Sequence, residues 1–205
     1  MAANTPGAMI YPALALLEFS SIAAGIQAGD AMVKKAPIET IRSGTVQPGY
    51  YLVMVTGDVA SVDEAVNAGR EWGQDALRDL IFLPNIHPGV VEGIGGGRSR
   101  MDAGADALGV VETETVAAVI GAADAGLKGA EVTLWQLRLA DGLGGKGLAL
   151  FSGLVADVEA AVEIAASHSG SHLVRQVVIP QLHPEMEENI ALNGRFGTHF
   201  SWPPA

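Results

Sequence analysis

The amino-acid sequence predicts an α+β protein made of two consecutive copies of one β-α-β-β-α-β unit. Ala13–Glu18 (ALALLE) matches Ala107–Glu112 (ALGVVE) at a spacing of 94 positions. Further along each half the spacing becomes 96, where Leu83–Pro88 (LPNIHP) matches Ile179–Pro184 (IPQLHP). Self-similarity at a nearly constant spacing indicates duplication of one structural unit. In both halves, β-rich runs alternate with Ala-rich segments of helical period, which gives the order of the elements.

The first half of the unit is predicted to be a strand followed by a helix. Ala13–Phe19 is a short apolar run of the kind that forms a buried strand. Ser20 or Ser21 can cap a helix by accepting a hydrogen bond from a backbone N–H of the first turn. Pro37 forces this helix to end near Lys35, because proline has no N–H and clashes with the preceding turn.

The second half of the unit is predicted to be two strands, a helix and a last strand. Ile38–Val46 and Tyr50–Thr56 are β-rich, and Gln47-Pro48-Gly49 between them is a turn in which Pro presets φ and Gly permits a positive φ. Ser61 is expected to open a helix that runs to about Gly73, and Ala76–Leu83 is expected to form the closing strand. A short helix is expected after each closing proline motif.

The repeats also set the expected domain boundaries. The second copy has two extra residues within Arg138–Gly147, and a small insertion is tolerated best in a surface loop between strands. The segment between the copies is rich in glycine, which is typical of a flexible linker. We therefore expect domains at 1–96 and 107–192, a linker at 97–106 and a C-terminal tail at 193–205.

Composition excludes several functions. The net charge of −11, with 12 Lys and Arg among 205 residues, argues against binding to nucleic acid or to an acidic membrane surface. The absence of cysteine excludes disulfides, a thiolate nucleophile and Cys-ligated metal centres. Met1–Leu17 lacks the basic region of a secretory signal, and no apolar run is long enough for a membrane-spanning helix, so a cytoplasmic location is expected.

On architecture alone, two interpretations remain open. Duplicated β-α-β-β-α-β units are shared by structural proteins and by ferredoxin-like proteins that bind ligands or catalyse reactions. The second interpretation is therefore a soluble trimeric ferredoxin-like regulator or enzyme that binds a small ligand at its subunit interfaces.

The motifs of both halves together resemble the bacterial microcompartment shell domain, over Ala13–Met186. Each half has the opening strand that ends in Glu, a helix that ends in Lys34 or Lys128, and a closing Pro-x-x-His-Pro-like stretch. The unpermuted tandem order is similar to the single-layer trimeric class, in particular to T-type subunits of propanediol-utilisation shells. The resemblance implies a structural, non-enzymatic protein of the microcompartment shell in the cytoplasm. Its implied form is a homotrimer that mimics a hexagon and joins other shell proteins edge to edge.

The same resemblance implies two sets of functional residues. The loop between the second and third strands lines a central pore in this family and would admit small polar metabolites. In this family, lysines of the first helix and residues of the closing motif lie at the edges of the hexagon-like tile. Without the resemblance, a lysine at a helix C-terminus is interpreted as a solvated side chain that the helix dipole favours. Many members have Arg in the closing motif where this chain has an amide, which lacks the five donors of Arg. The implied pore residues are Gln47, Pro48, Gly49, Asp141, Gly142, Leu143, Gly144 and Gly145, and the implied edge residues are Lys34, Lys128, Asn85 and Gln181.

No catalytic, metal or cofactor site is expected. T-type subunits hold an iron–sulfur cluster through a cysteine at the position of Gln47, and a glutamine amide is a poor ligand for such a cluster. Gly142–Gly147 formally matches G-x-G-x-x-G, but a dinucleotide fingerprint opens a helix, whereas Leu148–Phe151 reads as a strand. His87 and His183 occupy equivalent places, which duplication explains better than metal binding.

Overall fold

The computed structural model describes residues 13–96 and 101–192, and the C-terminal tail 193–205 lies outside the described residues. The chain divides into two compact units between Ile86 and His87, and Val46–Pro48 groups with the second unit. The boundaries expected near residues 96 and 106 remain a prediction. The first unit contains β1 (Ala13–Phe19), α1 (Ile22–Lys35), β2 (Thr40–Val46), β3 (Tyr50–Gly57), α2 (Val59–Gly73), a 3₁₀ turn (Gln74–Ala76) and β4 (Leu77–Leu83).

The second unit repeats this order after one additional helix at its start. It contains α3 (Pro88–Ile94), β5 (Ala107–Thr113), α4 (Val116–Gly129), β6 (Thr133–Leu139), β7 (Gly147–Gly153), α5 (Val155–Ser169), a 3₁₀ turn (Gly170–His172), β8 (Leu173–Pro180) and α6 (Pro184–Ala191). Although α3 follows the first repeat in sequence, it belongs to the second compact unit.

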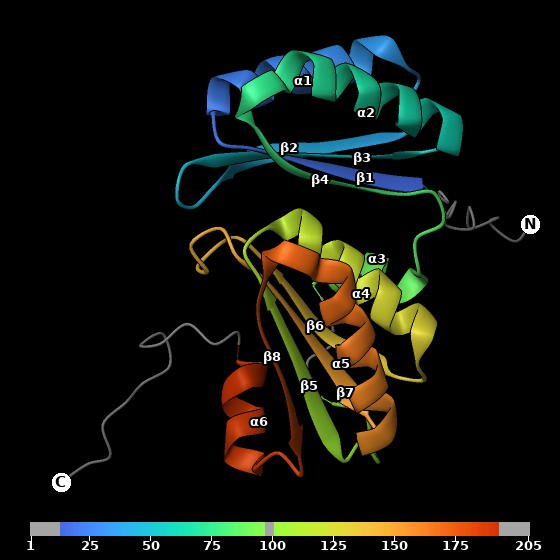
Figure 1. The fold of residues 1–205 in the computed structure, drawn as a ribbon, viewed down its shortest axis with the longest axis vertical. Coiled ribbons are helices and arrows are strands. Elements are labelled where there is room, and N and C mark those ends of the chain that lie inside the picture. Colours follow the sequence, from blue (N-terminus) through green and yellow to red (C-terminus); the bar gives the residue numbers. More distant parts are fainter. Residues whose placement is uncertain (1–12, 97–100, 193–205) are drawn as a thin grey trace, which may run out of the picture. The chain divides into compact units, whose positions relative to one another are not determined.

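Each unit has one four-stranded sheet, in the order β2-β3-β1-β4 or β6-β7-β5-β8, with two helices packed on one face (Figure 1). The central strands pair in the same antiparallel register, Ala13 opposite Gly57 in one sheet and Ala107 opposite Gly153 in the other. This identity confirms the predicted duplication and the α+β class. It also gives the positions of the paired central strands defined counterparts in the other unit.

Alternation along the strands places one apolar face of each sheet against its helices. In the first unit, Ala15, Leu17 and Phe19 of β1 are buried in a core with Met32 of α1 and Val62 of α2. Residues two apart on a strand share a face, so the apolar run at 13–19 supplies this core. Gly25 lets α1 approach closely, because an added Cβ there would lie 2.6 Å from Cδ1 of Tyr51.

One of the two predicted helix caps is confirmed by the structure and the other is not. The Ser21 hydroxyl accepts a hydrogen bond from the Ala24 N–H, as expected. The expectation that Ser61 opens the next helix is wrong by one turn: α2 begins at Val59, and the Asp58 carboxylate accepts from the Ser61 N–H. Hydrogen bonds from the side chain and the backbone N–H of Ser61 lower the pKa of Asp58. Leu154, the counterpart of Asp58, has no side-chain cap.

Candidate functional site

The two candidate pore segments are both connections between neighbouring strands. The first is residues 47–49, between β2 and β3, and the second is residues 140–146, between β6 and β7. The longer loop in the second repeat confirms the predicted site of the insertion. Glycines at positive φ form both turns, Gly49 at 120° and Gly144 at 65°, and an added Cβ at either would meet nothing within 4 Å. Both turns therefore expose polar backbone with little side chain around it.

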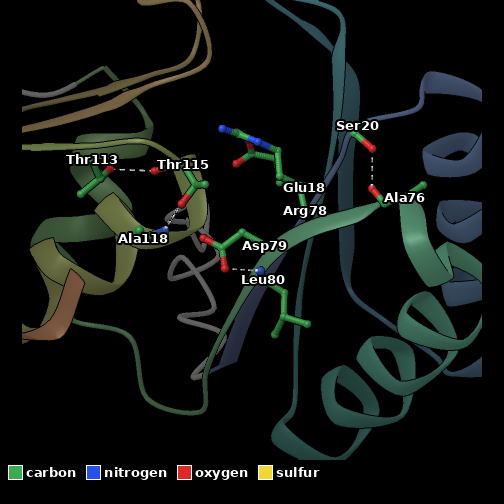
Figure 2. Close-up of polar contacts among 9 residues, drawn as sticks. All are labelled: Glu18, Ser20, Ala76, Arg78, Asp79, Leu80, Thr113, Thr115 and Ala118. Carbon is green, nitrogen blue, oxygen red and sulfur yellow. Dashed lines mark hydrogen bonds and ion pairs between the residues drawn. The ribbon is translucent and has the colours of Figure 1, made fainter. Parts of the chain in front are cut away.

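The glutamate near the end of the first strand forms an ion pair in each unit. In the first unit, Glu18 is fully buried and forms an ion pair with Arg78 (Figure 2). The Arg78 guanidinium lies 4.3 Å from the centroid of the Tyr50 ring. In the second unit, the counterpart Glu112 is partly exposed and accepts from Lys146 at 2.7 Å. Each unit thus neutralises the carboxylate near the end of its first strand, with a cation from the last strand in the first unit and from the β6–β7 connection in the second.

The candidate edge lysines each pair with an aspartate one helical turn earlier. Lys34 Nζ lies 2.6 Å from Asp30, and Lys128 Nζ lies 2.6 Å from Asp124. The two aspartates differ in burial: the Asp30 side chain is 58% exposed and that of Asp124 only 7%. Asp124 is covered because the chain enters α3 beside it, and its Oδ1 accepts from the His87 N–H at 2.7 Å.

The packing of α3 covers the edge of the second sheet. Val90 is fully buried, and an added Cβ on Gly93 would lie 2.9 Å from Leu134 and 3.1 Å from the Cβ of Leu137. An added Cβ on Gly89 would lie 3.1 Å from Leu127 of α4. The two glycines therefore give α3 a close approach to β6 and α4.

The corresponding surface of the first unit is uncovered within the single chain. Strand β6 is mostly buried, whereas its counterpart β2 has five exposed residues and two of intermediate exposure. Helix α6, the counterpart of α3, buries none of its residues. Its Met186 is 53% exposed, whereas the matching Val90 is 0% exposed.

The closing motifs have structural roles at the helix starts. His87 Nδ1 accepts from the Gly89 N–H and His183 Nδ1 accepts from the Glu185 N–H, so both histidines cap short helices. Gln181 has a φ of 51°, and its N–H donates to the Asp106 carbonyl at 2.7 Å. The side chains of Asn85 and Gln181 are both exposed, as an edge role requires.

The described part of the chain contains no group of three or more His, Cys, Asp or Glu residues that could hold a metal ion. Burial lowers the pKa of Arg138, whose guanidinium donates to the Ile190 carbonyl at 2.6 Å. Within residues 13–96 and 101–192, every helix is too short or too polar to cross a bilayer.

Comparison with known proteins decides the family. A family model of the BMC domain matches residues 13–86 and again 107–182, so it matches both repeats. The chain belongs to the bacterial microcompartment shell proteins. It is a structural component of the microcompartment shell, and the interpretation as a ligand-binding regulator or enzyme is not favoured by its relatives.

Several shell proteins are similar over most or part of the chain. The shell protein PduT of Citrobacter freundii is 43% identical over 176 residues, which are 85% of this chain and 95% of the relative. The shell protein PduA of Salmonella typhimurium is 39% identical over 84 residues, 40% of this chain and 89% of PduA. PduA thus matches about one repeat, whereas PduT matches both.

Solved structures agree with this assignment. The crystal structure of a microcompartment protein from Desulfitobacterium hafniense DCB has a TM-score of 0.72 and 38% identity, covering 86% of this chain and 98% of that one. The fused permuted hexameric shell protein MSM0275 has a TM-score of 0.55 at 19% identity, covering 75% of this chain and 79% of that one, and supports the fold alone.

Sequence analysis missed two features of this shell protein. Asp30 and Asp124 occupy matching repeat positions, and only the packing of α3 distinguishes them. Sequence analysis also did not predict the buried Glu18–Arg78 pair, because the partner lies 60 residues away in sequence. The matching glutamates at the ends of both opening strands were the available signal.

Proposed function

We propose that three copies of this shell protein close into one hexagon-like tile with a central pore. The observation that carries the proposal is the difference between the two units: the edge strand of the second is covered by α3, and the matching edge strand of the first is bare. An exposed edge strand and a helix with an exposed face on the same chain favour head-to-tail association. Because each chain supplies two equivalent domains, three chains supply the six sides of a hexagon.

The proposed pore is lined by Gln47, Pro48 and Gly49 in alternation with Asp141, Gly142, Leu143, Gly144 and Gly145. Small residues fit the crowding of chains at a symmetry axis. Backbone dipoles, three Gln47 amides and three Asp141 carboxylates favour small polar metabolites, first by size and then by charge. The exposure of Gln47 and Asp141 in the single chain supports this arrangement.

Edge-to-edge assembly with other shell proteins is proposed for Lys34, Lys128, Asn85 and Gln181. Both lysine side chains are at least 41% exposed while paired with aspartate, so a neighbouring tile can reach them. The protein is proposed to act through assembly and selective passage, without catalysis and without a bound cofactor. Gln47 in place of a soft thiolate ligand supports the absence of an iron–sulfur cluster.

Light scattering combined with negative-stain imaging tests the proposal. A tile predicts a mass near three times 21.1 kDa and six-sided particles that form sheets at high concentration. A monomeric mass, or discrete particles without a central depression, would contradict it. For the pore, Gln47→Ala with Asp141→Ala should change metabolite flux into reconstituted shells, and Glu163→Ala, an exposed charge on α5, is the matched control.

A further inference from the structure

A pocket of about 280 Å³ lies at the end of the second sheet that is opposite the β6–β7 connection. We infer that this pocket binds a small organic cation, a primary alkylammonium ion, between the carboxylates of Asp102, Glu131 and Asp157. The inference goes beyond the proposed tile and pore, because the seven residues of β7 separate the pocket from that connection by roughly 20 Å.

Four parts of the second unit form the walls of the pocket. The turn at 102–105 is closed by a hydrogen bond from the Ala105 N–H to the Asp102 carbonyl at 3.1 Å. The first residue of β6, Thr133, donates its hydroxyl hydrogen to Oδ2 of Asp102 at 2.6 Å. The end of β7 and the first turn of α5 complete the walls. These two hydrogen bonds fix the Asp102 carboxylate at the rim, over the end of the sheet.

The ionisable side chains of the lining are all acidic. Asp102, Glu131 and Asp157 line the pocket, and its described lining includes no Lys, Arg or His. Carboxylates that converge on one hollow raise the local concentration of cations. Asp157 lies in the first turn of α5 and already supplies the negative charge that a helix N-terminus favours, so the pocket does not require an anion. Ala103 and Leu154 add apolar surface that can cover a short alkyl chain.

A buried hydroxyl in the same pocket is a second, independent observation. Ser152 lines the pocket and is 1% exposed, and its Oγ has no hydrogen-bond partner among the described residues. Ser152 lies directly opposite Thr133 in the sheet, so both side chains are on the face that Asp102 covers. A buried hydroxyl without a partner is unfavourable, and a ligand N–H that donates to its oxygen removes this penalty.

The first unit lacks these features at the matching positions. Thr56, the counterpart of Ser152 at the spacing of 96, has a hydroxyl partner in Thr40. Where the second unit has its two acidic residues outside the turn, the first unit has Pro37 and Ser61. The acidic lining and the unpartnered hydroxyl therefore do not follow from the duplicated fold, which favours a ligand that is specific to the second unit.

An alkylammonium ion suits this lining better than a metal ion. Calcium takes about six to eight oxygen ligands at roughly 2.3–2.6 Å. In the described part of the chain, no group of three or more His, Cys, Asp or Glu residues could hold a metal ion. A primary ammonium group instead has three N–H donors, each of which reaches an oxygen at about 2.8 Å. It can therefore join carboxylates that are too widely spaced to share a metal.

Isothermal titration calorimetry on the full-length protein tests the site, with 3-hydroxypropylammonium chloride as the probe. The protein should bind one probe ion per chain. Glu131→Gln with Asp157→Asn should weaken binding at least about tenfold, because charge-assisted hydrogen bonds to the ammonium group are lost. Glu163→Gln, an exposed charge on α5 outside the pocket, is the matched control and should change the affinity less than about twofold. Absence of saturable binding at about 10 mM probe, or an equal loss in the control, would overturn the site.

Ser152→Ala gives a second readout that a structural role would move differently. Probe binding should weaken about tenfold, whereas the thermal midpoint should hold or rise, because the substitution removes a buried hydroxyl that has no partner. Thr56→Ala is the control in the first unit: it should lower the midpoint by breaking the bond to Thr40 and leave probe binding unchanged. A lower midpoint with unchanged binding in Ser152→Ala would show that the hydroxyl is structural and would contradict the inference.

Two other ligands separate the possible sources of the cation. Nα-acetyl-lysine methylamide carries the ammonium group of a protein side chain, and magnesium chloride supplies a metal ion. Tighter binding of either one than of 3-hydroxypropylammonium would overturn the assignment to a small free alkylammonium ion. These binding results are independent of the tile and the pore, which light scattering and flux measurements test separately.

Discussion

Replacing Arg78 by alanine should destabilise the first unit far more than the matching change in the second. The Glu18 carboxylate is 0% exposed and its guanidinium partner is 25% exposed, so the substitution removes a cation from a buried anion. Breaking a buried pair in this way costs about 3–5 kcal/mol. The partial exposure of Arg78 places the loss near the lower end, about 3 kcal/mol, which includes its stacking on Tyr50.

The control is Lys146→Ala, which breaks the counterpart pair with Glu112. Here the side chains are 47% and 32% exposed, and a pair of this kind contributes roughly 0–1 kcal/mol. In urea, with a slope of about 2 kcal/mol per M, Arg78→Ala should lower the unfolding midpoint by about 1.5 M and Lys146→Ala by less than about 0.5 M. Both variants are measured at one protein concentration. Equal shifts would refute the reasoning that burial decides the cost.

Three further substitutions test the packing. Asp124→Ala should cost about 1.5–3 kcal/mol in chemical denaturation, because it removes charge-assisted bonds to the His87 N–H and to Lys128; a loss below about 0.5 kcal/mol would contradict this. Gly25→Ala should destabilise the protein by about 1–3 kcal/mol, because the added Cβ overpacks against Tyr51. Gly29→Ala should stabilise α1 by up to about 1 kcal/mol, because the added Cβ would lie at an ordinary 3.4 Å from its nearest neighbour. Stability changes of the same sign at both sites would contradict this reasoning. Leu154→Asp should raise the thermal midpoint by supplying the missing cap of α5, worth about 1 kcal/mol, and an unchanged midpoint would argue against it.

The order of elements could be predicted from the sequence because it depends on local signals. Apolar runs, a serine before an Ala-rich segment and a proline after it act within a few residues, and the duplication shows each signal twice. The start of α2 was missed because both Asp58 and Ser61 are good capping residues and the sequence does not rank them. Two strands also begin one or two residues later than predicted, β2 at Thr40 and β4 at Leu77.

The functional surface was less accessible to sequence reasoning because it depends on which unit each short helix joins. Nothing local distinguishes Asp30 from Asp124, yet one is exposed and the other is covered by a segment that follows the first repeat. The presence of two units of the same fold within one chain reveals this difference. In a protein with a single such domain, the same information would require the structure of the assembly.

The most direct test of the central claim, that the short turns of three chains converge on one axis, is a distance measurement between spin labels at Gln47→Cys. The absence of other cysteines makes the label unique in each chain. A tile predicts one short distance with the signature of three coupled spins, shorter than that between labels at Glu163→Cys on α5. No coupling between the labels at position 47, or distances as long as those of the α5 labels, would contradict the account.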